Sequence, residues 1–456
     1  MKKSLFMFSV ITMIMLVLLS VGSIMAAPLF DFEGETVKLG FRFHDVTPFA
    51  PRGEVSWLDP DARLQAHIDA VEEMFNVKIE FVPATGDTNP EPHITAGITG
   101  DIIYHYHEAG ARRTEHVLFP LAMQGFIHRL DDYLDDEYYE SLPSTFRHKY
   151  GMQVGGHTYG VEALNLLVEP MVIIWNKDLF DEEGLPNPYD LYKEGKWDWD
   201  AFKDIAIQAT KDTTGDGEIN QLGIKFNLRP LGFHALSLFA TNNASVTREV
   251  DGRTVAVFDE PEAVEVLEYL QELWNLDVAR IDAGYANPRG GYTDYAMHVV
   301  FANSVSIPHS LMGVDRTDIA YSMVPLPRGP RATEHVAPLW NRWMGIIPIG
   351  VENPRAVIEV VNALRQLTEP YMDKTLEEFE EDFWDSWVMY LYDREALEVF
   401  QRYAMNAITV DNREIALQQG LGEVLDRIIE QDANITGELA AIKPVIQSFL
   451  DEVVNK

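Results

Sequence analysis

The chain has 456 residues and no cysteine, and its 72 acidic residues against 36 basic ones give a formal net charge of −36. Such an excess argues against a nucleic-acid partner and an anionic membrane surface, since both are bound by basic residues. Without cysteine there is no disulfide, thiolate metal site or cysteine nucleophile, and the length predicts two or three domains behind any leader.

The first residues follow the order of a secretory signal peptide. Lys2 and Lys3 precede an apolar stretch from Leu5 to Leu19, and small residues follow it as far as Ala27. The apolar stretch is short for a membrane span of about 20 residues, so we expect residues 1–27 to be cleaved. Because no cysteine is present to be lipidated, we expect a free protein in the periplasm and not a lipoprotein.

Strand and helix patterns alternate from residue 36 onward. Residues 36–43 alternate in polarity and predict a strand, Asp61 begins a predicted helix, and residues 77–82 predict the next strand. The apolar residues of the helix recur at spacings of three and four: Leu64, Ile68, Val71 and Phe75. This order predicts a parallel α/β unit.

The same alternation continues through the middle of the chain, with Asp198 as an expected N-cap and Gly184 as an expected helix stop. The further expected strands are 101–104, 158–162 and 171–175, and the expected helices are 118–125, 176–184, 199–210 and 262–276. From residue 353 onward the pattern is mostly helical, over 376–392, 395–407 and 414–454.

Four stretches, taken in chain order, resemble the family 1 extracellular solute-binding proteins, the sugar receptors of ABC importers. They are GDIIYHYHE at 100–108, YGVEALN at 159–165 followed by IWNKDLF at 174–180, IAYSMVPLPRGP at 319–330, and GIIPIGVENP at 345–354. In that family they correspond to a first-lobe binding loop, the first crossing between lobes, a strand and turn, and a return strand.

The resemblance implies an α/β fold of the two-lobed periplasmic binding protein type (type II), with a ligand cleft between lobes joined by hinge crossings. Lobe one would comprise residues 36–163 plus about 345–395, and lobe two residues 166–340 plus about 396–456. The implied function is the extracytoplasmic substrate-binding component of an ABC importer, which binds a carbohydrate, expected to be an oligosaccharide, and delivers it to the membrane permease subunits. A monomer with no catalytic residues and no required cofactor is expected.

A sugar has apolar ring faces and a rim of hydroxyl groups, so its site needs aromatic rings together with carboxylates, amides or imidazoles. Residues of these types gather in loops expected at the carboxyl ends of strands and near the crossings. The candidate ligand-binding residues are His44, Asp45, Trp57, His105, His107, Glu108, Glu162, His309, Trp340, Asn341 and Trp343. By the resemblance, His105 and Glu108 match ligand-contacting positions, although His105 stands where the family's motif has a tryptophan. His309 stands where a second-lobe loop of the family carries a stacking aromatic residue.

Residues 212–223 resemble the first part of a calcium-binding EF-hand loop. The candidate ligands at positions 1, 3, 5, 7 and 9 are Asp212, Thr214, Asp216, Glu218 and Asn220. Gly223 occupies the twelfth position, where the full motif has a bidentate glutamate. A structural calcium ion and an Asx-turn loop without an ion therefore both remain open.

Two other functions remain open from the sequence. A receptor for a peptide or another small solute would use the same fold, because one fold serves several ligand classes. A secreted glycoside hydrolase would need two carboxylates about 5–10 Å apart, and the 72 acidic residues leave that open, although the sequence has neither a nucleophile elbow nor an HExxH motif.

Overall fold

A computed structural model describes most of the chain. The described residues are 30–41, 60, 62–83, 90–108, 118–134, 138, 153–154, 157–162, 169–226, 231–281, 295–301, 320–365, 394–405, 407–408 and 413–455. Several predictions lie outside these residues: the leader 1–27, the helix 376–392, and the candidates His44, Asp45, Trp57 and His309.

The strands are β1 (Thr36–Phe41), β2 (Lys78–Pro83), β3 (Ile102–Glu108), β4 (Gln153–Val154), β5 (His157–Thr158), β6 (Gly160–Glu162), β7 (Glu169–Asn176), β8 (Leu222–Phe226), β9 (Thr247–Val250), β10 (Arg253–Ala256), β11 (Ala279–Ile281), β12 (Tyr295–Phe301), β13 (Tyr321–Pro325), β14 (Ala337–Ile346) and β15 (Ala407–Ile408). The α-helices are α2 (Ala62–Phe75), α3 (Glu91–Ala96), α4 (Leu118–Met123), α6 (Lys177–Glu183), α7 (Pro188–Lys193), α8 (Trp199–Ala209), α9 (Leu231–Phe239), α10 (Pro261–Asn275), α11 (Pro354–Arg365), α13 (Arg394–Met405), α14 (Arg413–Gln418), α15 (Leu421–Glu430) and α16 (Ile435–Val453). Short 3₁₀ turns occupy Leu130–Asp132 and Ala240–Asn242.

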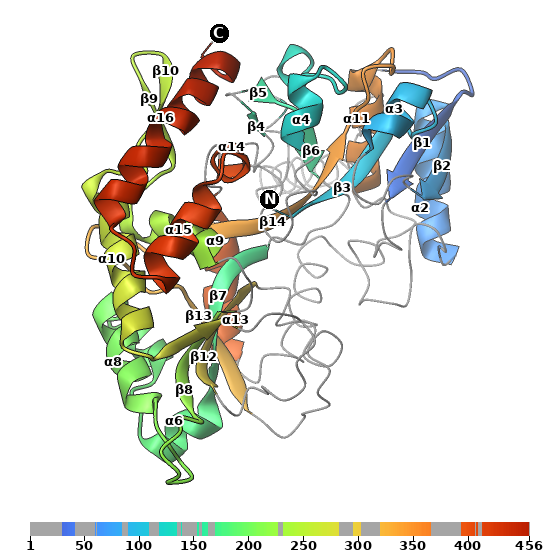
Figure 1. Cartoon of the computed structure of the whole chain (residues 1–456). Coiled ribbons are helices and arrows are strands. Elements are labelled where there is room, and N and C mark those ends of the chain that lie inside the picture. The colour runs from blue at the N-terminus through green and yellow to red at the C-terminus, as the bar shows by residue number, and fades with distance from the viewer. Residues whose placement is uncertain are drawn as a thin grey trace, which may run out of the picture.

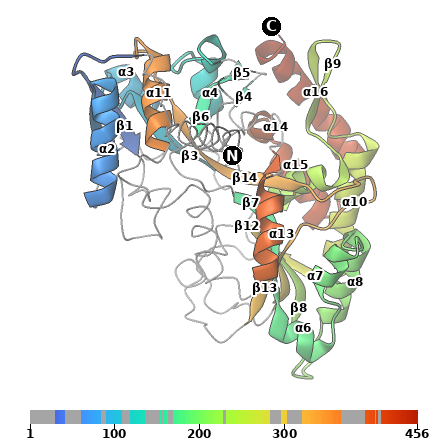
Figure 2. The same cartoon turned by 180° about the vertical axis from the view of Figure 1, so that it is seen from behind.

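One hydrogen-bonded sheet runs through the described part of the molecule in the order β11-β8-β12-β7-β14-β3-β1-β2. β13 pairs with β7, and β6 and β15 pair with β14. We call β1, β2, β3 and β6 with α2 and α11 the first lobe, and β7, β8, β12 and β13 with α8, α9 and α10 the second lobe. β14 lies between these two groups in both views (Figures 1 and 2).

The first lobe begins with the predicted strand–helix–strand unit. β1 pairs in parallel with β2, with Val37 opposite Ile79, and on its other side in parallel with β3, with Leu39 opposite Ile102. The four apolar residues predicted to form one helix face are all buried in α2. They pack with β1 and α11 in one hydrophobic cluster, where each fully buried leucine or isoleucine stabilises the fold by roughly 1.5–3 kcal/mol.

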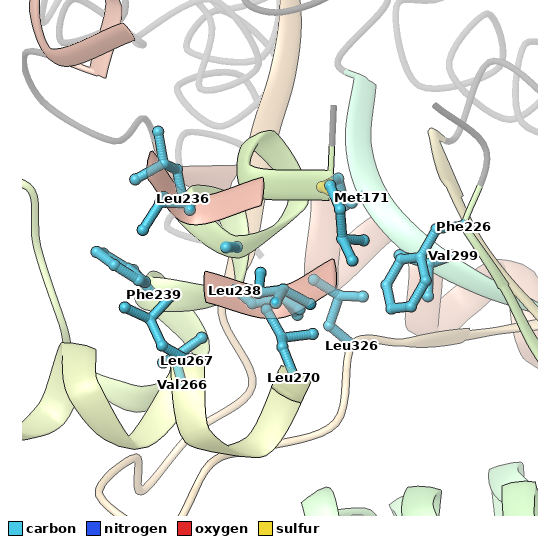
Figure 3. Packing of buried hydrophobic residues seen from close by; sticks show 14 of the residues in the cluster. Met171, Phe226, Leu236, Leu238, Phe239, Val266, Leu267, Leu270, Val299 and Leu326 are labelled. Carbon is cyan, nitrogen blue, oxygen red and sulfur yellow. The ribbon is translucent and has the colours of Figure 1, made fainter. Parts of the chain in front are cut away.

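The second lobe is built around β7, a run of buried apolar residues, as expected of a strand covered on both faces. Its residues pack with α8, α9 and α10 in a large hydrophobic cluster, and Figure 3 shows Met171 of β7 beside Leu326, Phe226 and Val299. The predicted end signals are confirmed. The side chain of Asp198 accepts the Ala201 N–H at 3.0 Å to cap α8, and α6 ends at Gly184, whose φ of 64° is left-handed.

The C-terminal region is mostly helical, as predicted over 414–454, and it forms the helices α14, α15 and α16. Gly420 has a φ of 92° and separates α14 from α15, and the Asn434 side chain accepts the Gly437 N–H at 2.8 Å to begin α16. α15 packs on α9 and α10, so this region covers the second lobe.

A buried tyrosine fixes the base of β14 to the second lobe. The Tyr403 hydroxyl of α13 lies 2.9 Å from the Met171 carbonyl of β7 and 3.0 Å from the Val336 carbonyl just before β14. The Leu326 N–H donates to the same hydroxyl at 3.3 Å. Two residues beyond α13, β15 pairs with β14 at Ala337 and Pro338. The start of β14 is therefore held by the second lobe.

Candidate functional site

The strand β14 belongs to both lobes. Its first half pairs with β7 of the second lobe, with Asn341 opposite Glu169. Its second half pairs with β3 and β6 of the first lobe over residues 341–346. The chain therefore crosses between the lobes within one continuous strand, and the residues near 341 lie at the crossing.

Many of the predicted ligand-binding residues meet along this strand. Asn341 lies opposite Glu108, Arg342 opposite His107, Trp343 opposite Tyr106, and Met344 opposite His105. Met344 also lies opposite Glu162 on its other side. The sequence candidates His105, His107, Glu108, Glu162, Asn341 and Trp343 therefore occupy three hydrogen-bonded strands, with Trp340 next to them in β14.

The predicted location of residues 104–108 in a loop is wrong. These residues continue β3 to Glu108, because β14 supplies hydrogen-bonding partners for the whole segment. This partner lies more than 230 residues further along the chain, so local sequence patterns gave no indication of it. As a consequence, His105, His107 and Glu108 each lie opposite a defined residue of β14.

Glu169 was not among the predicted residues. It begins β7 and lies opposite Asn341 of β14, next to a register irregularity between Leu339 and Asn341.

The entry of β6 is held by a polar cluster of the first lobe. The Asp131 carboxylate accepts the Thr158 N–H at 2.8 Å and lies 3.4 Å from the His157 imidazole. Tyr159, directly before β6, is half-buried, and this burial raises the pKa of its hydroxyl while the nearby Arg129 lowers it. This cluster fixes the chain immediately before the crossing residue Glu162.

The candidate calcium loop is closed by its own hydrogen bonds. The Asp212 carboxylate accepts backbone N–H groups from Thr214, Gly215 and Gly217 at 2.7–2.9 Å. The Gly217 N–H is the main cause of the lowered pKa of Asp212. The side-chain oxygen of Asn220 accepts hydrogen bonds from the Thr213 N–H and hydroxyl, and the Asp216 carboxylate accepts the Glu218 N–H. No group of three His, Asp or Glu side chains able to hold a metal ion occurs among the described residues. These hydrogen bonds are those of an Asx-turn loop, and a structural calcium ion at residues 212–223 stays a prediction.

A surface pocket of about 440 Å³ lies elsewhere in the first lobe, between residues 30–37, Asp101 and residues 350–357. It contains none of the predicted ligand-binding residues. Its lining includes five acidic residues, Asp31, Glu33, Glu35, Asp101 and Glu352, of which Asp31 and Asp101 already accept backbone N–H groups.

No protein-family model matches the chain, and no curated protein is similar to it in sequence. In the part of the chain that the structure describes, no helix combines the length and apolarity that crossing a bilayer requires.

Solved structures do match the fold over nearly the whole chain. The cyclic α-maltosyl-1,6-maltose binding protein from Arthrobacter globiformis matches with a TM-score of 0.60 at 15% identity, covering 91% of this chain and 99% of its own. The ABC substrate-binding protein from Listeria monocytogenes in complex with cycloalternan matches with a TM-score of 0.56 at 14% identity, with the same coverage. UgpB from Mycobacterium tuberculosis in complex with glycerophosphocholine matches with a TM-score of 0.56 at 14% identity, covering 86% of this chain and 95% of its own.

The chain therefore has the two-lobed α/β fold of the solute-binding proteins of ABC transporters, as the sequence resemblance predicted. Its similarity to sugar-binding members of that class extends over both lobes.

Proposed function

We propose that this protein is the extracytoplasmic substrate-binding component of an ABC importer and that its substrate is a carbohydrate, most simply an oligosaccharide. It binds the ligand between its two lobes and delivers it to the membrane permease subunits. The observation that carries the proposal is the pairing of β14 with both lobes, which gathers aromatic, carboxylate and amide residues at the crossing. The similar solved structures, several of them bound to carbohydrates, support the ligand class.

The bounds proposed for the lobes are those predicted from the sequence, residues 36–163 with about 345–395 and residues 166–340 with about 396–456. The contacts of β14 support this division, because its two halves pair with strands from the two ranges. Ligand contacts to both lobes at once would select the closed arrangement. We propose a monomeric protein outside the cytoplasmic membrane.

A binding protein without catalysis is favoured over a glycoside hydrolase. A hydrolase places an acid and a nucleophile or base around one glycosidic bond, whereas the similar structures are substrate-binding proteins. We therefore expect ligand recovered from the protein to be unchanged. Detection of shortened or hydrolysed sugar after incubation would favour the hydrolase.

A receptor for another small solute is the second candidate function. It is favoured by one observation, the similarity to UgpB in complex with glycerophosphocholine over both lobes. The fold alone does not decide between these ligands, so the ligand must be identified by binding.

A thermal-shift screen of the purified protein tests the proposal. Mono- and oligosaccharides, glycerophosphodiesters and short peptides are added separately, because a ligand that binds only the folded state raises the unfolding midpoint. At a ligand concentration of 100 Kd the stabilisation is about 2.7 kcal/mol. A shift with one class of sugar supports the proposal, whereas a shift with a phosphodiester or peptide alone refutes the carbohydrate assignment.

A further inference from the structure

The connection between β13 and β14, residues 326–336, is closed at its two ends by side chains. The Nδ1 atom of His335 lies 2.9 Å from the Leu326 carbonyl oxygen, and the Tyr403 hydroxyl lies 3.0 Å from the Val336 carbonyl oxygen. The Leu326 N–H donates to the same hydroxyl at 3.3 Å. We call Leu326, His335, Val336 and Tyr403, with the three bonds that join them, the clasp. It binds both backbone polar groups of Leu326, which is 1% exposed.

The partner of His335 fixes the place of its proton. A carbonyl oxygen only accepts hydrogen bonds, so the bond to Leu326 requires a proton on Nδ1, and a neutral imidazole then has none on Nε2. A fall in pH adds the second proton at Nε2 and gives the ring a positive charge. The clasp therefore needs only the neutral ring, and the charged ring would have to keep its place without full hydration.

The surroundings of His335 oppose that charge. The ring is half-buried, with its centroid 4.8 Å from that of Tyr192 in α7. Burial is the main cause that lowers the pKa of His335; the bond to the Leu326 carbonyl opposes it, the Arg328 guanidinium lowers the pKa further, and the Asp198 carboxylate raises it. The neutral ring is therefore favoured by the folded protein.

The helix on the other side of the clasp adds no neutralising charge through the residues that meet it. Burial raises the pKa of the Tyr403 hydroxyl of α13 and that of the Tyr192 hydroxyl of α7, so both stay neutral in acid. The charge that acts on Tyr192 from α13 is the positive one of Arg402. Since α7 and α13 both pack against β13, as Figure 2 shows for α13, His335 is the group of the clasp that changes its charge between pH 7.5 and 5.

The middle of the connection is held by groups that keep their charge in this range. Arg328 donates to the Gly195 carbonyl at 2.7 Å. Arg331 makes two hydrogen bonds to the Glu265 carboxylate, at 2.6 and 2.7 Å, and lowers the pKa of that carboxyl. A change of protonation at His335 therefore acts on the two ends of the connection and not on its middle.

We propose that the clasp is a pH-sensitive device: with a neutral His335 it holds the base of β14 to α13, and with a protonated His335 it opens, so that the imidazolium reaches water. Because the pKa of His335 is lowered by folding, the clasp contributes its full stability above the ordinary His pKa of about 6.5 and loses it as the pH falls through the lower pKa of the folded protein. Since β14 pairs with strands of both lobes, opening the clasp loosens the strand that joins them. The device does not depend on which ligand the protein binds.

The test is hydrogen exchange of the purified protein without ligand, measured by mass spectrometry at pH 7.5 and 5.0 and corrected for the intrinsic exchange rate. Peptides that contain Leu326 and Ala337 report on the ends of the connection, and a peptide from α10 is the internal reference. In wild type, protection at the ends should fall about three- to tenfold at pH 5.0 relative to α10, since one unit of pKa difference corresponds to a factor of ten.

Two variants assign the effect to His335. His335→Asn keeps an N–H donor near the position of Nδ1 but does not titrate, so the protection of the ends should no longer depend on pH. His157→Asn is the matched control, because His157 is half-exposed beside Asp131 in the first lobe, and it should keep the wild-type pH dependence at the ends of the connection. A wild type whose ends stay as protected at pH 5.0 as at pH 7.5 refutes the proposal without any variant. A folded His335→Asn that loses protection in acid as wild type does also refutes it.

Discussion

The hydroxyl group of Tyr403 provides the strongest test of how β14 is fixed at its base. We predict that Tyr403→Phe, which removes one oxygen atom, destabilises the protein by about 2–4 kcal/mol. The buried hydroxyl contacts the Met171 and Val336 carbonyls and accepts the Leu326 N–H. Each lost hydrogen bond costs about 1 kcal/mol, and each buried group left without a partner costs about 1–3 kcal/mol.

The measurement is equilibrium urea unfolding followed by tryptophan fluorescence, with the free energy compared at equal slope. Two other tyrosines serve as controls. The Tyr269 hydroxyl is buried and donates one bond, to the Trp199 carbonyl at 2.8 Å, so Tyr269→Phe should lose about 1 kcal/mol. Tyr192 is half-buried against His335, and Tyr192→Phe should change stability by less than about 0.5 kcal/mol. If Tyr403→Phe costs no more than Tyr192→Phe, the reasoning is wrong.

Three further predictions concern stability. Gly223→Ala should lower the free energy of unfolding, measured in urea, by about 3 kcal/mol or more. The reason is that a Cβ at this position would lie 2.3 Å from the Ala206 carbonyl oxygen. Burial lowers the pKa of His67, so the stability of the protein should fall as the pH drops below the ordinary His pKa of about 6.5. In His67→Gln, the unfolding midpoint measured from pH 7.5 to 5 should depend less on pH than in wild type. Asp212→Ala should lower the thermal unfolding midpoint at pH 7 and have little effect near pH 2, because the Gly217 N–H stabilises the ionised Asp212 carboxylate. If calcium raises the midpoint of the wild type, the loop at residues 212–223 binds an ion and is not an Asx-turn loop alone.

Local patterns were sufficient to predict many elements of the fold. The apolar spacing in α2 identified its buried face, and Asp198 and Gly184 marked helix ends, because capping depends on residues within one turn of the end. The tail was predicted to be mostly helical, but the points at which its helices end were not predicted. Its apolar periodicity continues across Gly420 and Asn434, so the breaks depended on two residues whose backbone conformation the periodicity does not report.

The candidate site was predictable by residue type but not by arrangement. Asn341, Trp343, Glu108 and Glu162 were selected because sugars need such side chains, and the structure places all four on strands that pair at the crossing. Their positions opposite one another depend on register, which is set by pairing over long sequence distances.

The sharing of β14 also constrains the order in which the protein can fold. The sheet of the first lobe contains β1 near the start of the chain and the second half of β14 near residue 346, so it can be completed only when most of the chain is available. Loop closure over such separations slows folding. A newly made chain therefore remains without its finished first-lobe sheet until β14 has been synthesised, a delay that would suit the location outside the cytoplasmic membrane that we propose.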